Sequence, residues 1–170
     1  MKVILYTYSD GSCSVVRFQK EDGGYTSGML KLIDDDMTPD EAALTIAKKH
    51  KKAAVSYRLI DATELPGGTD NNYDRTFYNA FKDTGKVEID LVKAVEIAKE
   101  KIRESRKRVL VDLDLEYTKA NEQSDTVEKA KVVERKQIAR DATADIRLDA
   151  KNETDLKLAM ETIISEVENL

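Results

Sequence analysis

The sequence is poor in the residue types that carry most protein chemistry. Its 170 residues include one cysteine, one histidine, two prolines and no tryptophan. Cys13 alone cannot form a disulfide within the chain, and Cys13 with His50 cannot complete a four-ligand zinc site. With one histidine, no Ser/His/Asp catalytic set can be proposed either. We therefore predict no enzymatic activity, no catalytic or metal-ligating residue and no cofactor.

Long apolar runs are also lacking. No stretch approaches the roughly 18 apolar residues that a membrane span needs, and the N-terminus has no signal-peptide pattern. Charged residues make up 36% of the chain and hydrophobic residues 41%, with a formal net charge of −5. These values exclude wholesale disorder and predict a soluble protein of one or two small modules, made in a reducing compartment.

Residues 1–66 have the pattern of a small α+β domain. Val3–Tyr8 and Cys13–Phe18 are runs of β-branched and aromatic residues on either side of Asp10-Gly11, which predicts a β-hairpin. Val55–Ile60 predicts a third strand. With the helix described next, this gives a ββαβ arrangement.

The strongest local signal in this domain is a helix start at Pro39. Thr38 can cap the first backbone N–H groups, and Glu41 occupies the third position of a capping box. We expect this helix to end in the cationic run Lys48–Lys52, where positive charge suits the helix dipole. His50 lies in this run and is expected to be a solvated residue at the helix end.

Residues 67–89 are predicted to form a connecting segment with a short helix over Asp74–Phe81. Asp74 would cap this helix and Gly85 would close it. Its three aromatic residues form a candidate contact between modules or with a partner: Phe77, Tyr78 and Phe81.

Residues 90–170 are predicted to be helical. A helix of about 30 residues is expected from Asp90 to Glu122, followed by a break at Gln123–Asp125 and a second helix over Thr126–Ala144. Asn152 or Thr154 would cap a final amphipathic helix. The fold class is therefore α+β, with a ββαβ module, a long helical hairpin and a C-terminal helix.

Each of these three helices carries an apolar stripe at steps of three, four or seven residues. Because the first stripe is longer than the small N-terminal module could cover, we take the stripes of the first and last helices as candidate interaction residues. Those candidates are Val95, Ile102, Val109, Leu113, Tyr117, Leu156, Met160, Ile163 and Val167. The middle helix has a weaker stripe, made of Val127, Ala130, Val133, Ile138 and Ala142.

Two charged clusters allow other interpretations. Asp34–Asp36, or Asp112 with Glu116, could supply oxygen ligands to a divalent metal, although a solvated acidic loop and an ordinary helix face explain them better. The basic run Lys99–Arg108 could meet phosphate, but interleaved glutamates favour pairing within the helix. Binding to nucleic acid is accordingly not expected.

Several segments resemble a known group of proteins. Leu65-Pro66 followed by an Asp-Arg-x-Phe-x-x-Ala segment and a long helix is similar to small, mostly uncharacterised proteins encoded by tailed bacteriophages and prophages. A later Arg-Lys-Gln helix is similar to the same group and, more distantly, to phage tail-fibre assembly proteins. The similar segments are Leu65–Pro66, Asp74–Phe81, Ile89–Ala94, Ile102–Arg103 and Arg135–Ala144.

This resemblance implies a non-enzymatic function in the phage tail region. The protein would be a structural component of the tail or tail-fibre apparatus, or its assembly chaperone, in the virion or the host cytoplasm. Its partners would be other tail or fibre proteins, in an oligomer or a hetero-complex. The alternative is a phage-encoded cytoplasmic regulator or inhibitor that binds a host protein or nucleic acid through the basic run Lys99–Arg108.

Overall fold

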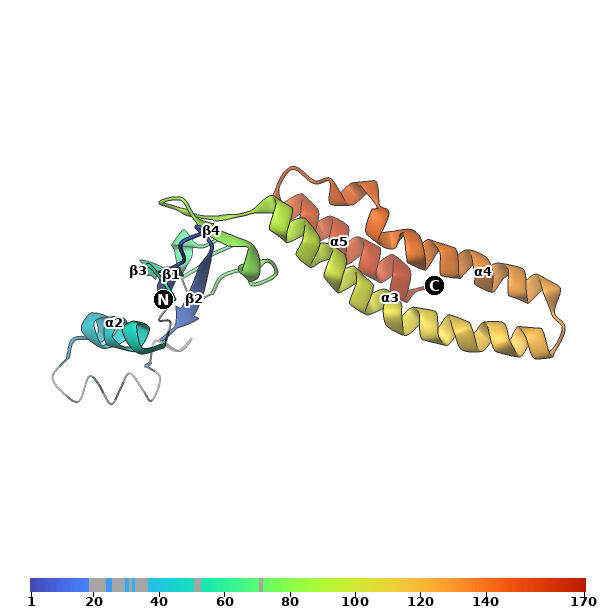
Figure 1. Ribbon diagram of the computed structural model, residues 1–170, viewed down its shortest axis with the longest axis horizontal. Helices are drawn as coiled ribbons and strands as arrows, with labels where there is room; N and C mark the ends of the chain where they lie inside the picture. The colour runs from blue at the N-terminus through green and yellow to red at the C-terminus, as the bar shows by residue number, and fades with distance from the viewer. Residues whose placement is uncertain (19–23, 26–29, 31, 33–36, 51–52, 71) are drawn as a thin grey trace. The chain divides into compact units, whose positions relative to one another are not determined.

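The computed structural model describes residues 1–18, 24–25, 30, 32, 37–50, 53–70 and 72–170 (Figure 1). The chain has the predicted α+β fold and divides into two compact units, Met1–Asp90 and Leu91–Leu170. Among the residues that the structure describes, the first unit contains the strands and the helix Pro39–His50, and the second unit contains the long helices that follow. Segment 67–89 belongs to the first unit. No helix in the described ranges combines the length and the apolar character needed to cross a membrane.

A three-stranded antiparallel sheet forms the centre of the first unit. Its strands are β1 (Lys2–Thr7), β2 (Cys13–Arg17) and β3 (Ser56–Asp61), in the order β2-β1-β3. The predicted turn between β1 and β2 is present, with Gly11 at φ 78°. Both faces of the sheet are covered, so the central strand buries four consecutive residues, Val3–Tyr6.

Helix α2 (Pro39–His50) covers one face of the sheet. The predicted capping box is formed, because the Thr38 backbone N–H donates to Glu41 Oε2 at 2.9 Å and the Glu41 N–H donates to Thr38 Oγ1 at 3.3 Å. The Thr38 hydroxyl also donates to Glu41 Oε2 at 2.7 Å, and this bond, together with the one from the Thr38 backbone N–H, lowers the pKa of Glu41. Three alanines of α2 pack against the sheet residues Ile4 and Tyr6; they are Ala42, Ala43 and Ala47.

A second β-hairpin covers the opposite face of the sheet, where the sequence predicts a short helix over 74–81. Only a 3₁₀ turn, Tyr78–Ala80, is helical in that range. The chain then forms β4 (Phe81–Asp83) and β5 (Val87–Ile89), with Gly85 in the turn at φ 101°. Phe81 and Val87 pack in one cluster with Val3 and Leu5 of the sheet. Burial against the sheet therefore overrides the local helical signal.

The second unit consists of α3 (Leu91–Glu122), α4 (Thr126–Asp141) and α5 (Glu153–Glu168). The predicted hairpin and C-terminal helix are confirmed. Asp125 caps α4 and Asn152 caps α5. The second predicted helix ends three residues earlier than expected, because two 3₁₀ turns, Ala142–Ala144 and Ile146–Leu148, carry the chain from α4 toward α5.

Candidate interaction surface

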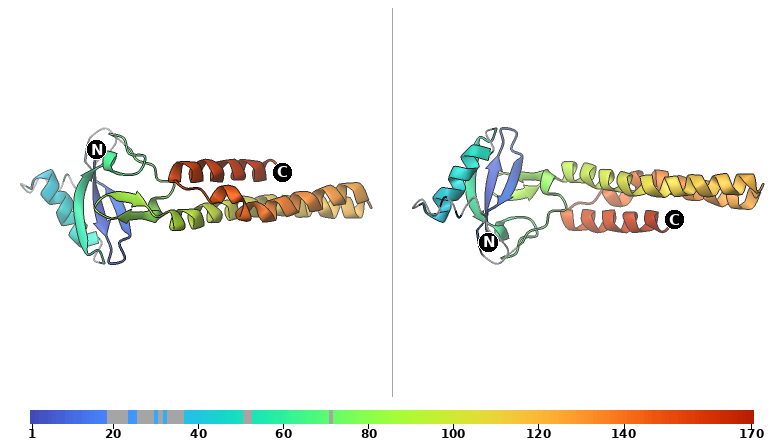
Figure 2. Two further views of the ribbon diagram at one scale, coloured as in Figure 1. Left: turned by 90° about the horizontal axis from the view of Figure 1, so that it is seen from above. Right: turned by 90° about the horizontal axis from the view of Figure 1, so that it is seen from below.

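Helix α3 changes its packing partner halfway along its length. It has 32 residues, whereas α4 and α5 have 16 each. Helix α5 lies along the first half of α3, and α4 runs back along the second half (Figure 2). Ser105 Oγ donates to Glu168 at the end of α5 (2.8 Å), and Arg106 Nη1 donates to the Arg140 carbonyl near the end of α4 (2.8 Å). The change of partner therefore lies at Ser105–Arg106.

We call residues 106–141, the second half of α3 with α4, the arm. Its two helices meet along one seam of buried apolar residues: Leu113, Ala120, Val132 and Ala139. Ion pairs border this seam, with Arg135 Nη1 2.6 Å from Glu116 Oε2 and Lys136 Nζ 2.8 Å from Asp114 Oδ1. In the second unit, which is described in full, no third helix lies along the arm beyond the end of α5.

The arm exposes large apolar side chains outside this seam. Six of them are between 37% and 65% exposed: Val111, Leu115, Tyr117, Val127, Val133 and Ile138. At 100° per residue, Val111 and Leu115 lie on the side of α3 opposite Leu113, which faces the seam. Val127 and Ile138 lie in the same way on the side of α4 away from Val132. Each helix of the arm therefore has a partly apolar outer face.

The stripe predicted for α4 is not the face that packs on α3. Four of its five residues are exposed, namely Val127, Ala130, Val133 and Ile138, and only Ala142, just beyond the end of α4, is buried. The packed face of α4 consists of Val132, Lys136 and Ala139. The predicted stripe followed apolar residues only, so it did not include Lys136. In the structure the stem of Lys136 is buried in the seam and its charge reaches Asp114.

Most of the candidate interaction residues are buried within their own unit. In the helical unit these are Ile102, Leu113, Leu156, Met160, Ile163 and Val167. Val95 and Val109 are half-buried, and Tyr117 is exposed. In the first unit Phe77 and Phe81 are buried, and Tyr78 is exposed with its ring 5.6 Å from the Arg75 guanidinium. Val111 and Leu115, which are exposed on the arm, lie four residues apart but outside the apolar stripe predicted for this helix.

The basic run Lys99–Arg108 is largely occupied by acceptors within the helical unit. Lys99 pairs with Glu96 at 3.2 Å and Arg103 with Glu100 at 2.9 Å. Arg106 binds the backbone of α4, as described above, and Arg108 lies 3.5 Å from Glu168. This pairing within the unit reduces the charge available to a phosphate backbone.

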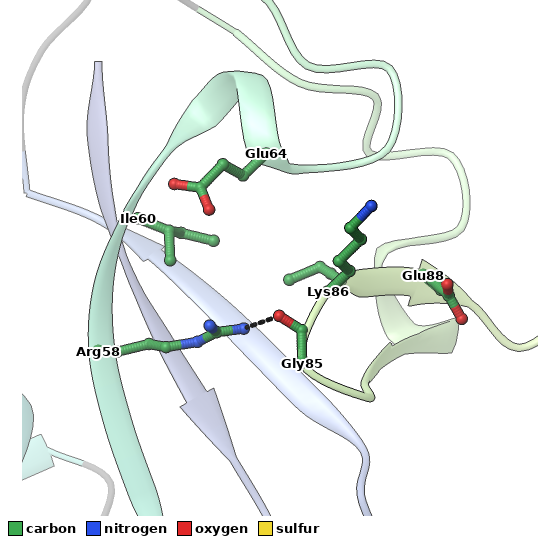
Figure 3. A pocket seen from close by; sticks show the side chains of 7 residues that line it. Arg58, Ile60, Glu64, Gly85, Lys86 and Glu88 are labelled. Atoms are coloured by element: carbon green, nitrogen blue, oxygen red, sulfur yellow. Dashed lines mark hydrogen bonds between the residues drawn. The ribbon is translucent and has the colours of Figure 1, made fainter.

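A shallow cavity of about 310 Å³ lies between β3 and the β4–β5 hairpin (Figure 3). Arg58, Glu64, Lys86 and Glu88 contribute opposite charges to its lining. The Arg58 guanidinium is held by the Asp83 carboxylate at 2.8 Å and by the Gly85 carbonyl at 3.3 Å. These contacts connect the hairpin to the sheet, so Arg58 has a structural role here.

The structure describes three of the residues that the sequence singles out for their chemistry: Cys13, Asp112 and Glu116. Cys13 is buried, and burial with the nearby Asp83 charge raises its pKa to about 12, which keeps the thiol protonated. Glu116, a candidate metal ligand, is paired with Arg135. Asp34–Asp36 and the His50 side chain lie outside the described residues. Among the residues that are described, no group of three or more His, Cys, Asp or Glu side chains could hold a metal ion.

The chain was also compared with known proteins. No family model matches it, and neither a curated protein nor a solved structure is significantly similar to it.

Proposed function

We propose that this protein is non-catalytic and acts through protein–protein contacts, as a component of a bacteriophage tail or tail-fibre apparatus or as its assembly chaperone. The arm is the docking surface in this proposal. The phage context comes from the resemblance of the segments between Leu65 and Ala144 to tailed-phage proteins. The protein would therefore be found in the virion or in the host cytoplasm, together with a tail or fibre protein.

The observation that carries the proposal is the outer face of α3 in the arm. Val111 and Leu115 lie one turn apart there and are both more than half exposed. Burying one such side chain in an interface contributes about 1.5–3 kcal/mol, so two adjacent ones can anchor a partner. The buried, protonated Cys13 thiol also supports a non-catalytic role.

The test is binding between the full chain and the tail or fibre proteins encoded beside it. Co-expression and light scattering would detect a complex, and calorimetry would give its dissociation constant. Replacing both Val111→Ser and Leu115→Ser should raise this constant at least roughly tenfold. Leu158→Ser is the matched control, because Leu158 is similarly exposed but lies on α5, outside the arm. This variant should bind like the unaltered protein.

Two results would contradict the proposal. One is the absence of a complex with any neighbouring tail or fibre protein. The other is binding to an oligonucleotide that falls steeply with salt and is lost with Lys107→Glu and Arg108→Glu, which would favour the regulator alternative. If a complex forms, mass spectrometry of purified virions distinguishes a structural component, present in the particle, from a chaperone.

A further inference from the structure

The outer face of α4 carries a short pattern with an unusual symmetry. Four residues at spacings of four, three and four form it: Val127, Lys131, Glu134 and Ile138. At 100° per residue they lie within about 60° of one another around the helix, on the side away from the seam. All four residues are exposed. Their chemical order is apolar, basic, acidic, apolar.

This order is self-complementary when the helix is paired with an antiparallel copy of itself. With a twofold axis between Val132 and Val133, Val127 lies opposite the second copy's Ile138. Lys131 lies opposite the second copy's Glu134, and the twofold axis repeats each pair. A parallel arrangement would instead oppose lysine to lysine and glutamate to glutamate. We propose that the outer face of α4 binds α4 of a second copy of this chain, antiparallel and with twofold symmetry.

The outer face of α3 lacks this symmetry. In the antiparallel register that pairs Val111 with Leu115, Lys107 would lie opposite Lys119. The same register would place Glu104 opposite Glu122. Like charges in direct opposition disfavour the pairing, whereas α4 brings opposite charges together. The charge pattern therefore selects α4 as the self-association surface and leaves the outer face of α3 open for a different partner.

Pairing of α4 with α4 of a second copy would disrupt only a weak contact within the helix. The Lys131 ammonium lies 3.2 Å from Glu128 of its own helix, an exposed pair of the kind that contributes little to stability. Ala130, which is exposed beside the pattern, has a small side chain that allows the two helices to approach closely. A contact along one 16-residue helix, about 24 Å long, is small for an interface. We expect a reversible dimer with a dissociation constant of roughly micromolar order.

Sedimentation equilibrium of the full chain over a range of concentrations tests this inference. The unaltered protein should show a monomer–dimer equilibrium. Lys131→Glu places two pairs of facing glutamates in the dimer, and Glu134→Lys places two pairs of facing lysines there. Each single variant should therefore raise the dissociation constant at least roughly tenfold. An equimolar mixture of the two variants should form a heterodimer, because the two glutamates on the pattern of one chain then face the two lysines on the pattern of the other.

The matched control is Lys107→Glu, a reversal of an exposed charge on α3, which should leave the dimer unchanged. Far-UV circular dichroism checks that each variant keeps its helices. A monomer at every concentration, a dimer that neither reversal weakens, or a mixture that fails to associate would each overturn the inference. Failure here is distinguishable from failure of the proposed function, which is tested by Val111→Ser and Leu115→Ser on the other helix.

Discussion

Lys136 of α4 places its ammonium 2.8 Å from the Asp114 carboxylate of α3, on the opposite side of the arm's seam. The ammonium also lies 4.6 Å from the centre of the Tyr117 ring. Lys136 is only 8% exposed, so its aliphatic stem fills a position that an apolar residue would occupy in an ordinary helical hairpin. The charge itself remains near solvent, because Asp114 is mostly exposed. Packing and pairing therefore contribute separately at this position.

We predict that Lys136→Ala destabilises the protein by about 1–2 kcal/mol, because it removes the buried stem as well as the charge. Lys136→Met should lower the free energy of unfolding by less than about 1 kcal/mol, because it keeps a side chain of similar length and leaves Asp114 in water. Urea unfolding followed by far-UV circular dichroism measures both values. Lys119→Ala, at an exposed position of α3, is the control and should have little effect. If Lys136→Ala and Lys136→Met lowered the stability equally, the charge of Lys136, and not the packing of its stem, would be its main contribution to stability.

The turn between α3 and α4 depends on Asp125. Its Oδ1 accepts hydrogen bonds from the backbone N–H groups of Val127 (3.1 Å) and Glu128 (2.9 Å). Asp125→Ala leaves both N–H groups without this acceptor. It should lower the free energy of unfolding, measured with urea, by about 1 kcal/mol. Asp125→Asn keeps an acceptor at the same place and should recover most of the loss. If Asn were as damaging as Ala, the cap would not be the source of the stability.

Cys13 provides a test of the first unit. Burial and the nearby Asp83 charge raise its pKa to about 12, well above the value of a free thiol, about 8.5. At mildly alkaline pH, the folded protein should therefore react with an alkylating reagent at least roughly a hundredfold more slowly than the unfolded protein. Burial slows the reaction further. Comparison of alkylation rates with and without denaturant checks this prediction, and a fast reaction of the folded protein would contradict it.

Local signals in the sequence predicted much of the fold. The Thr38 and Glu41 capping box, the Asp10-Gly11 turn and the Asp125 cap each depend on residues within a few positions of one another. Such signals act through backbone hydrogen bonds and allowed φ values, which do not depend on distant parts of the chain. For this reason the predicted helix starts at Pro39 and Thr126 agree with the structure, and the last helix uses Asn152, one of its two candidate caps.

The failures have a different origin. Phe81 belongs to a strand because it is buried against Val3 and Leu5, more than 70 residues earlier in the chain. Lys136 occupies a seam position that an apolar periodicity search excludes. Both results depend on which surfaces meet in the folded chain, and residue spacing alone does not contain that information. Residue spacing also does not show which side chains of the arm are exposed, because their exposure depends on where α5 ends along α3.

The chain between α4 and α5 should respond to acid through Arg147. Its guanidinium donates to both oxygens of Asp145, at 2.9 and 2.7 Å, and to both oxygens of Glu166 of α5, at 2.8 and 2.6 Å. These hydrogen bonds lower the pKa of Asp145 and of Glu166. A lowered carboxyl pKa means that the contribution of the pair is present above the ordinary value, about 4, and is lost as pH falls through the folded-state pKa.

We therefore predict that the carboxyl carbons of Asp145 and Glu166 titrate, by NMR, below the ordinary midpoints of about 3.9 and 4.3. Arg147→Gln removes the guanidinium and should raise both midpoints toward these values. Glu41 is the internal control, because hydrogen bonds from Thr38 and not from Arg147 lower its pKa, and its midpoint should therefore stay low in the variant. Unchanged midpoints for Asp145 and Glu166 in the variant would show that Arg147 does not hold this segment to α5 in solution.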